Sequence, residues 1–80
     1  MLTVHIKLYG SLPGRVPGYD PEKGVTLELD PGARISDLAA RLGIGADEEA
    51  VIAMAGRVAR RDDPVENGAS LRIFPVAHGG

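Results

Sequence analysis

The residues whose types and order could do chemistry lie at the end of the chain, where 76–80 reads Val-Ala-His-Gly-Gly. Gly79 and Gly80 have no side chain, so they adopt backbone angles closed to other residues. They can also pass through a channel too narrow for a Cβ atom. We therefore expect 76–80 to form a flexible tail that carries Gly80, as the reactive residue, into a partner's active site.

The residues just before the glycines are candidates for holding that partner. Ordering the tail costs about 1–2 kcal/mol per residue, and other contacts must offset this cost. Phe74 is the best anchor, because aromatic side chains often carry much of an interface's binding energy. Leu71 and Ile73 take the inward phase of the last strand, so Phe74 should face outward, with core packing as the alternative. The predicted partner-binding residues are Phe74, Pro75, Val76, Ala77 and His78.

Two of these residues have more than one interpretation. Pro75 either ends the strand, because it lacks an N–H, or serves as a rigid spacer. His78 is either a solvated tail residue or a specific contact and proton donor, since histidine titrates near neutrality.

Composition excludes several other kinds of site. The sequence has no cysteine, nine basic and eleven acidic residues, and a formal net charge of −2. A nucleic-acid partner would require a clear basic excess, and the apolar start "MLTVHIKLYG" is too short for a membrane span or a leader. We expect a cytoplasmic protein with no metal site, no nucleic acid and no membrane among its partners. One cluster of charged residues could bind an acidic partner but is more typical of solvated surface. Its members are Arg57, Arg60, Arg61, Asp62 and Asp63.

Eighty residues are enough for one domain, 1–80, with an aliphatic core. Apolar residues alternate with polar ones over 2–9 and 25–30, which predicts two strands joined by the Gly- and Pro-rich loop 10–24. The run 50–55 is apolar throughout, as expected for a strand buried on both faces. Val58 indicates a brief strand, and 70–75 is the last strand, after the turn pair Asn67-Gly68.

One helix is predicted between these strands, over about 36–42. Ser36 is the expected N-cap and Asp37 favours the positive helix start. Apolar residues at spacings of three and four predict one buried face, and Gly43 suits the residue that closes the helix. A mixed sheet of four or five strands with one main helix across it is the α+β arrangement called β-grasp, or ubiquitin-like.

Five segments together resemble a known family. They are "VHIKLYGSL", "LELDPGARISDLAARLGI", "GR", "ENGASLRIFP" and the final "GG", in that order. This series is similar to the ubiquitin-like sulfur carriers typified by the small subunit of molybdopterin synthase (MoaD) and the thiazole-pathway carrier (ThiS). Phe74-Pro75 before the tail favours the molybdopterin branch.

The sequence departs from the family pattern at three places. His78 stands where a small residue is usual, and the tail lacks the second proline. Ala55 replaces the usual asparagine before the Gly-Arg pair, and Asn67-Gly68-Ala69 replaces a common Asp-Gly-Asp.

The resemblance implies a chemistry in which this chain is a carrier rather than a catalyst. An adenylyltransferase of the MoeB/ThiF type, related to ubiquitin-activating enzymes, would use Mg-ATP to adenylate the Gly80 carboxylate. Sulfur from a donor persulfide would then give a thiocarboxylate, and a MoaE-type synthase subunit would accept it, with the chain as the small subunit of that enzyme. No permanently bound cofactor is implied.

Three other functions stay open on the sequence. The sulfur could go to thiazole or another product, Gly80 could be joined to lysines of target proteins, or the chain could be a non-covalent interaction module.

Overall fold

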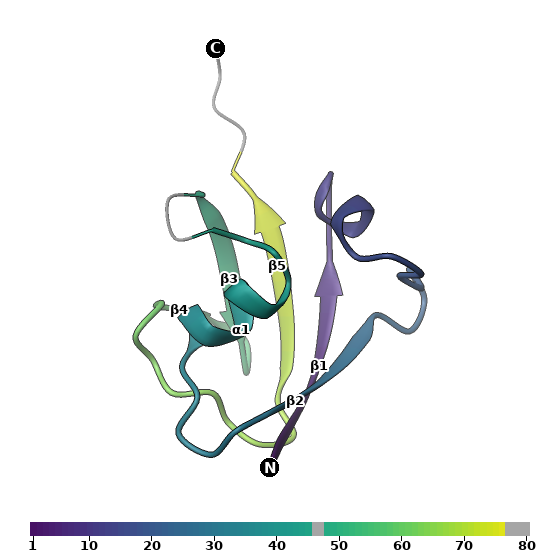
Figure 1. Ribbon diagram of the computed structural model, residues 1–80. Coiled ribbons are helices and arrows are strands. Elements are labelled where there is room, and N and C mark those ends of the chain that lie inside the picture. Colours follow the sequence, from purple (N-terminus) through teal and green to yellow (C-terminus); the bar gives the residue numbers. More distant parts are fainter. Residues whose placement is uncertain (46–47, 77–80) are drawn as a thin grey trace.

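A computed structural model describes residues 1–45 and 48–76 of the chain (Figure 1). The strands and the main helix follow one another along the chain in the predicted order. The elements are β1 (Leu2–Leu8), the short 3-10 helix η1 (Leu12–Arg15), β2 (Val25–Leu29), α1 (Ile35–Arg41), β3 (Ala50–Met54), β4 (Arg57–Ala59) and β5 (Ser70–Pro75).

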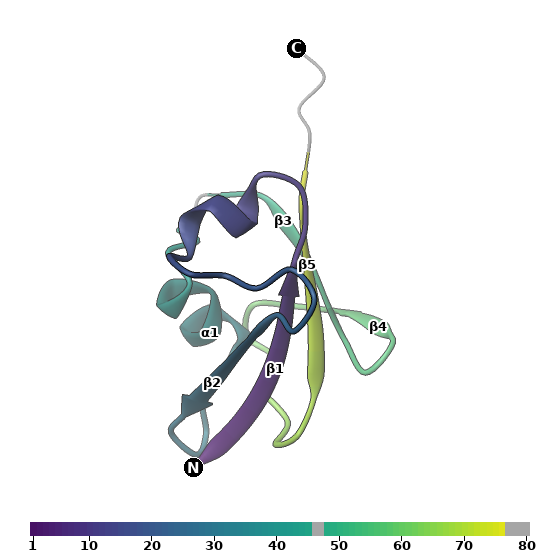
Figure 2. The same cartoon turned by 90° about the vertical axis from the view of Figure 1, so that its right-hand side faces the viewer.

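The five strands form one mixed sheet in the order β2-β1-β5-β3-β4. The central pair β1 and β5 is parallel, and the other neighbours are antiparallel. α1 lies across one face of this sheet, as Figure 2 shows from the side. This is the β-grasp fold, and the predicted fold class is confirmed.

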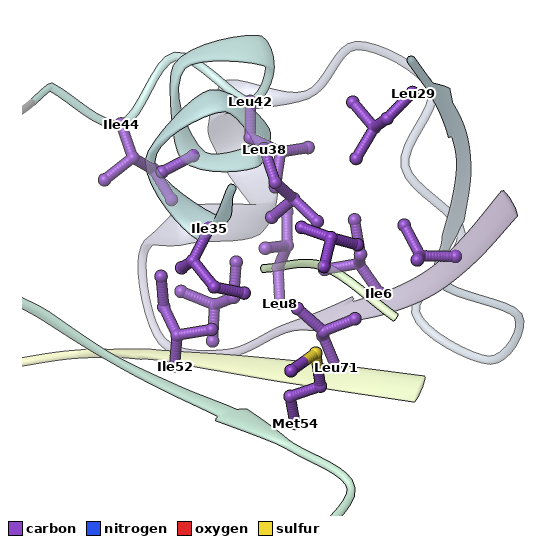
Figure 3. Packing of buried hydrophobic residues seen from close by; sticks show 14 of the residues in the cluster. Ile6, Leu8, Leu29, Ile35, Leu38, Leu42, Ile44, Ile52, Met54 and Leu71 are labelled. Carbon is purple, nitrogen blue, oxygen red and sulfur yellow. The ribbon is translucent and has the colours of Figure 1, made fainter. Parts of the chain in front are cut away.

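The core lies between α1 and the face of the sheet that the helix covers (Figure 3). Strand alternation supplies one half of it, because successive side chains point to opposite faces. The other half comes from the apolar face of α1, where Ile35, Leu38 and Ala39 are buried. The residues less than 2% exposed are Val4, Ile6, Ile35, Leu38, Ala39, Leu71 and Ile73.

The start of α1 differs from the prediction. The helix begins at Ile35 with Arg34 as the N-cap residue, so Ser36 is not the cap. The Asp37 carboxylate accepts a hydrogen bond of 2.8 Å from the Arg34 backbone N–H. The backbone N–H groups of Ile35 and Ser36 donate to carbonyls of the 61–63 turn, so tertiary contacts replace the expected side-chain cap. The end of the helix is as predicted, because Gly43 has φ +79°.

The prediction that β3 is buried on both faces is wrong. Ile52 and Met54 are buried, whereas Val51, which precedes them on the strand, is 38% exposed. A single helix covers only one face of the sheet, so even an apolar strand keeps its other face uncovered. We call this uncovered side the open face.

The loop 10–24 also contains more structure than its composition indicates. Leu12–Arg15 forms a 3-10 turn with Pro13 near its start, and Leu12 is buried with 3% exposure. The apolar side chain anchors the connection to the core.

A two-residue hairpin joins β3 to β4. Met54 pairs with Arg57, and the intervening Ala55 and Gly56 have φ of 54° and 82°. Positive φ at both central positions is the type I′ turn, for which Asn-Gly is the favoured pair. Ala55 is the only non-glycine residue with positive φ in the described part of the chain.

Candidate functional site

The residues before the Gly-Gly end are held between two neighbouring strands. The Tyr9 N–H at the end of β1 donates to the Ile73 carbonyl at 3.1 Å. On the other side Pro75 pairs with Ala50, and the Val76 N–H lies 3.5 Å from the Glu49 carbonyl. The described chain is therefore hydrogen-bonded up to Val76. The remaining predicted site residues, Ala77, His78, Gly79 and Gly80, lie outside the described residues.

Phe74 faces away from the core, as predicted from the phase of the strand. Its neighbours Ile73 and Leu71 are 0% and 1% exposed, whereas Phe74 is 37% exposed. The ring stacks on Tyr9 with centroids 4.5 Å apart and planes 16° apart. The ring is thus covered on one side by Tyr9, and part of it stays exposed just before Val76. Its role in binding a partner stays a prediction.

Pro75 packs closely against Gly10, where a Cβ atom would have too little room. A Cβ atom on Gly10 would lie 2.5 Å from the Pro75 Cγ, and Gly10 has φ +64°. Any side chain at position 10 must therefore displace the proline ring or the strand that carries it. Sequence reasoning did not single out Tyr9 or Gly10, because only the pairing of β1 with β5 brings them to the tail.

An apolar area surrounds Phe74 on the open face. Val51 on β3 lies directly opposite Phe74 in the strand register. Val51 and Val76 are each 38% exposed, and Val58 on β4 is 70% exposed. A hollow beside Phe74 is lined by Ala53, Ala55 and Gly56. We call four of these side chains the apolar patch: Val51, Ala53, Phe74 and Val76.

Two arginines on the helix side brace the loop that leads into β3. Arg61 is half-buried, and its Nη2 donates to the carbonyls of Gly45 at 3.2 Å and Glu48 at 2.8 Å. The interpretation of Arg61 as solvated surface is therefore wrong, because its guanidinium holds two backbone carbonyls. Arg57, Arg60 and Asp62 are exposed, and Asp63 is half-buried.

Arg15 makes a similar contact from η1. Its Nη1 donates to the Gly43 carbonyl at 3.2 Å and forms an ion pair of 2.6 Å with the Glu48 carboxylate. The hydrogen bond from Arg15 lowers the pKa of Glu48 below its ordinary value. These contacts join the segment after β1 to the segment before β3, the two segments that flank the end of β5.

Within residues 1–45 and 48–76, no group of three His, Cys, Asp or Glu side chains is placed to hold a metal ion. No helix in this part of the chain is long and apolar enough to cross a bilayer. His5 is exposed on β1, with Nδ1 3.0 Å from the Thr26 hydroxyl.

No protein-family model matches the sequence, and no curated protein matches it. Solved structures do match the fold. The small archaeal modifier protein 1 of H. volcanii aligns with a TM-score of 0.75 and 20% identity, over 96% of this chain and 100% of that one. A second structure, SAMP1 from Haloferax volcanii, aligns with a TM-score of 0.71 and 23% identity, over 98% and 99%.

A structure from Pyrococcus furiosus is also similar. It is described as "putative molybdopterin converting factor, subunit 1" and aligns with a TM-score of 0.75 and 20% identity, over 96% of this chain and 100% of that one. At these identities the likeness concerns the fold, and it extends over nearly the whole chain.

Proposed function

We propose that this protein is a sulfur carrier whose C-terminal residue, Gly80, is converted to a thiocarboxylate. One observation carries the proposal. On a β-grasp fold, the strand that leads to the Gly-Gly sequence carries a partly exposed, stacked phenylalanine near its end and is held by strands on both sides. A rigid root with a glycine end suits delivery of a terminal group into another protein.

The first chemical step activates the carboxylate. A carboxylate is a poor electrophile, because its charge is delocalised and its leaving group would be oxide. In the proposed step the Gly80 carboxylate oxygen attacks the α-phosphorus of Mg-ATP on a MoeB/ThiF-type adenylyltransferase. Pyrophosphate leaves, and the product is an acyl-adenylate at Gly80.

The second step introduces sulfur. The terminal sulfur of a donor persulfide attacks the acyl carbon, and AMP leaves with its phosphate oxygen. A thiol then reduces the resulting acyl disulfide, which releases the thiocarboxylate. This ion is nucleophilic at sulfur and attacks an activated carbon of a precursor, after which the spent carboxylate can be charged again.

The division of labour between the folded domain and the tail follows from these steps. Gly79 and Gly80 fit a narrow channel, while the apolar patch around Phe74 binds the partner and offsets the cost of ordering the tail. Pro75 is the last residue of β5 and packs against Gly10. The catalytic side chains belong to the partners.

The sulfur acceptor that we favour is a precursor of molybdopterin, on a MoaE-type synthase subunit. The resemblance of the "KLYGSL" and Phe74-Pro75 segments supports this choice, as does the name of the Pyrococcus furiosus structure. Thiazole or another sulfur-containing product is the alternative within the same chemistry.

A second candidate is a protein modifier that becomes amide-linked to lysines through Gly80. The similar structure from H. volcanii supports it, because its name describes a small archaeal modifier protein. Carrier and modifier share the adenylation step, so the two functions separate only at the acceptor.

The test is to incubate the protein with the adenylyltransferase of its own organism, Mg-ATP and a persulfide donor, and to measure the mass of the C-terminal peptide. We expect the peptide to gain the mass of one sulfur in place of one oxygen. Deleting Gly80, or extending the chain beyond it, should abolish this gain and leave the unfolding curve unchanged.

Gly79→Val should also prevent charging, because a β-branched side chain restricts and widens the tail. Gly14→Val is its matched control, since a Cβ at Gly14 meets nothing within 4 Å. Charging of the extended protein would overturn the carrier proposal. Adducts on lysines of larger proteins, with no acceptance of sulfur, would favour the modifier.

A further inference from the structure

Basic side chains gather on the open face next to the apolar patch. Lys7 on β1 and Arg72 on β5 are register partners in the central parallel pair. Together with Lys23, from the loop before β2, they line a shallow hollow that also includes His5 and Ser70. All of these side chains are exposed. We call Lys7, Lys23 and Arg72 the basic cluster.

The charges of the basic cluster are not neutralised within the described part of the chain. The one ion pair found there, Arg15–Glu48, lies on the helix side. Asp20 binds the backbone N–H groups of Glu22 and Lys23 rather than an ammonium group. No acidic residue lines the hollow.

This arrangement is unfavourable for the isolated domain. Like charges that face each other on neighbouring strands destabilise a sheet, and the whole chain carries a net charge of −2. The acidic residue of β2 on this face, Glu28, lies opposite Thr3 at the other end of β1. Folding therefore leaves three cations concentrated next to the apolar patch.

Arg72 connects the basic cluster to the apolar patch. It lines the hollow with Lys7 and also the neighbouring hollow with Ala53 and Phe74. A partner that covers Phe74 therefore also covers Arg72. A partner without an anion at that place would have to remove a guanidinium from water with no compensating charge, which is costly.

We propose that the protein partner that charges Gly80 presents an acidic segment to Lys7, Lys23 and Arg72 while its apolar side chains cover Phe74. The inference rests on the proposed function and adds the charge of the docking surface. Complementary charge at the edge of an apolar contact speeds association and rejects wrong partners. Three cations on a net-negative domain are too few for a nucleic-acid footprint, which favours an acidic protein over a polyanion.

The experiment measures association of the full-length protein with the adenylyltransferase by stopped-flow fluorescence or surface plasmon resonance. The test variant is Lys7→Glu/Arg72→Glu. The matched control is Arg41→Glu/Arg60→Glu, which makes the same change in net charge. Both control residues are exposed, one on α1 and one in the turn that covers the start of α1. Circular dichroism and thermal melts establish that each variant is folded.

We expect the test variant to associate at least about tenfold more slowly at low salt, because steering by charge changes association rates by about 10–1000-fold. The control should change the rate by less than about threefold. Wild-type association should slow as salt rises from about 0.1 M to 1 M, where the screening length falls from about 10 Å to about 3 Å. The gap between wild type and test variant should narrow over the same range.

Several results would overturn the inference. One is a wild type that is charged at Gly80 but associates at a rate independent of salt. Another is a test variant no slower than the control. Preferential binding of duplex DNA or phosphatidylserine vesicles over the adenylyltransferase would assign the cluster to another ligand. Failure of wild-type charging would instead contradict the proposed function, so the two failures are distinguishable.

Discussion

The two faces of the sheet are built from the same strands but have different surroundings. On the covered face, side chains such as Ile73 and Leu71 pack under α1 with almost no exposure. On the open face, Phe74 and Arg72 alternate with them along the same strand and remain exposed. One strand therefore contributes to folding through every second residue and leaves its other residues exposed.

The difference lies in how much helix the chain has. α1 spans seven residues, about 10 Å at 1.5 Å per residue, and it covers a single face. A second helix on the other side would cover the open face and would bury its apolar side chains. The open face is thus a consequence of the short chain, and the apolar and basic side chains on it are the features that need a functional explanation.

The largest expected effect is on the covered face. Ile73→Ala removes a side chain that is 0% exposed and should lower the free energy of unfolding by about 2–5 kcal/mol. That is a large part of the stability of a small domain, about 5–15 kcal/mol. Urea unfolding measures the loss. Ile73→Val should cost only about 0.5–1.5 kcal/mol, and it provides the measurement if the alanine variant does not fold.

The adjacent residue should behave in the opposite way. Phe74→Ala should weaken partner binding by about 2–4 kcal/mol. It should cost the fold about 2 kcal/mol, from the lost stacking on Tyr9 and from the part of the ring that the fold removes from water. Titration calorimetry with the adenylyltransferase and thermal melts give the two numbers. Thr26→Ala, at an exposed residue of β2 on the far edge of the sheet, is the control. A large drop in melting temperature with binding intact would show that Phe74 belongs to the core.

Gly10→Ala should lower the free energy of unfolding, because it disturbs the contact between Gly10 and Pro75. An L residue in the left-handed region costs about 1–2 kcal/mol, and the new Cβ would also meet the Pro75 Cγ at 2.5 Å. Gly18→Ala is the matched control, because Gly18 has φ +75° and nothing within 4 Å of its Cβ position. Unfolding of both variants separates the backbone cost from the contact. Equal losses would show that the approach of Pro75 to Gly10 contributes nothing.

A gain in stability is expected at the hairpin of the open face. Ala55→Asn should raise the free energy of unfolding by about 0.5–1 kcal/mol, because asparagine tolerates positive φ better than alanine. The melting temperature should rise by a few degrees, since about 1 kcal/mol corresponds to roughly 4–8 °C in a domain of this size. Ala55→Gly should also raise the melting temperature, because glycine adopts positive φ without steric cost. A lower melting temperature in both variants would contradict the assignment of the turn.

The elements that sequence alone predicted are those governed by local periodicity. Alternation identified the inward residues of β1 and β5, and the same alternation placed Phe74 on the outward side of its strand. The end of α1 was also predicted from a local signal, because Gly43 suits the left-handed residue that closes a helix.

What could not be predicted depends on contacts between distant segments. Arg34 becomes the N-cap because the 61–63 turn supplies carbonyls to the helix start, and no local pattern encodes that turn's position. The apolar run of β3 does not reveal how many faces a helix covers. Tyr9 and Gly10 reach the tail only through the register of β1 with β5. These long-range pairings decide the surroundings of the site.

The smallest expected effect is the pH dependence of the ion pair at the rim of the covered face. The hydrogen bond from Arg15 lowers the pKa of Glu48 in the folded protein, whereas the unfolded value is about 4.3. The pair therefore stabilises the fold fully above that unfolded value. Its contribution is lost as the pH falls through the lower, folded pKa.

Glu48→Gln should accordingly be less stable than wild type near neutral pH, and the difference should shrink toward zero as the pH falls below about 4. Urea unfolding from neutral to acidic pH gives the two curves. The control is Glu66→Gln, at an exposed carboxylate with no ion pair among the described residues. Its free energy of unfolding should differ from that of wild type by a constant amount across this pH range. Both side chains of the pair are partly exposed, so added salt should also reduce the difference. A difference that grew on acidification would mean that Glu48 is protonated more readily in the folded state, and it would reverse the sign assigned to its contact with Arg15.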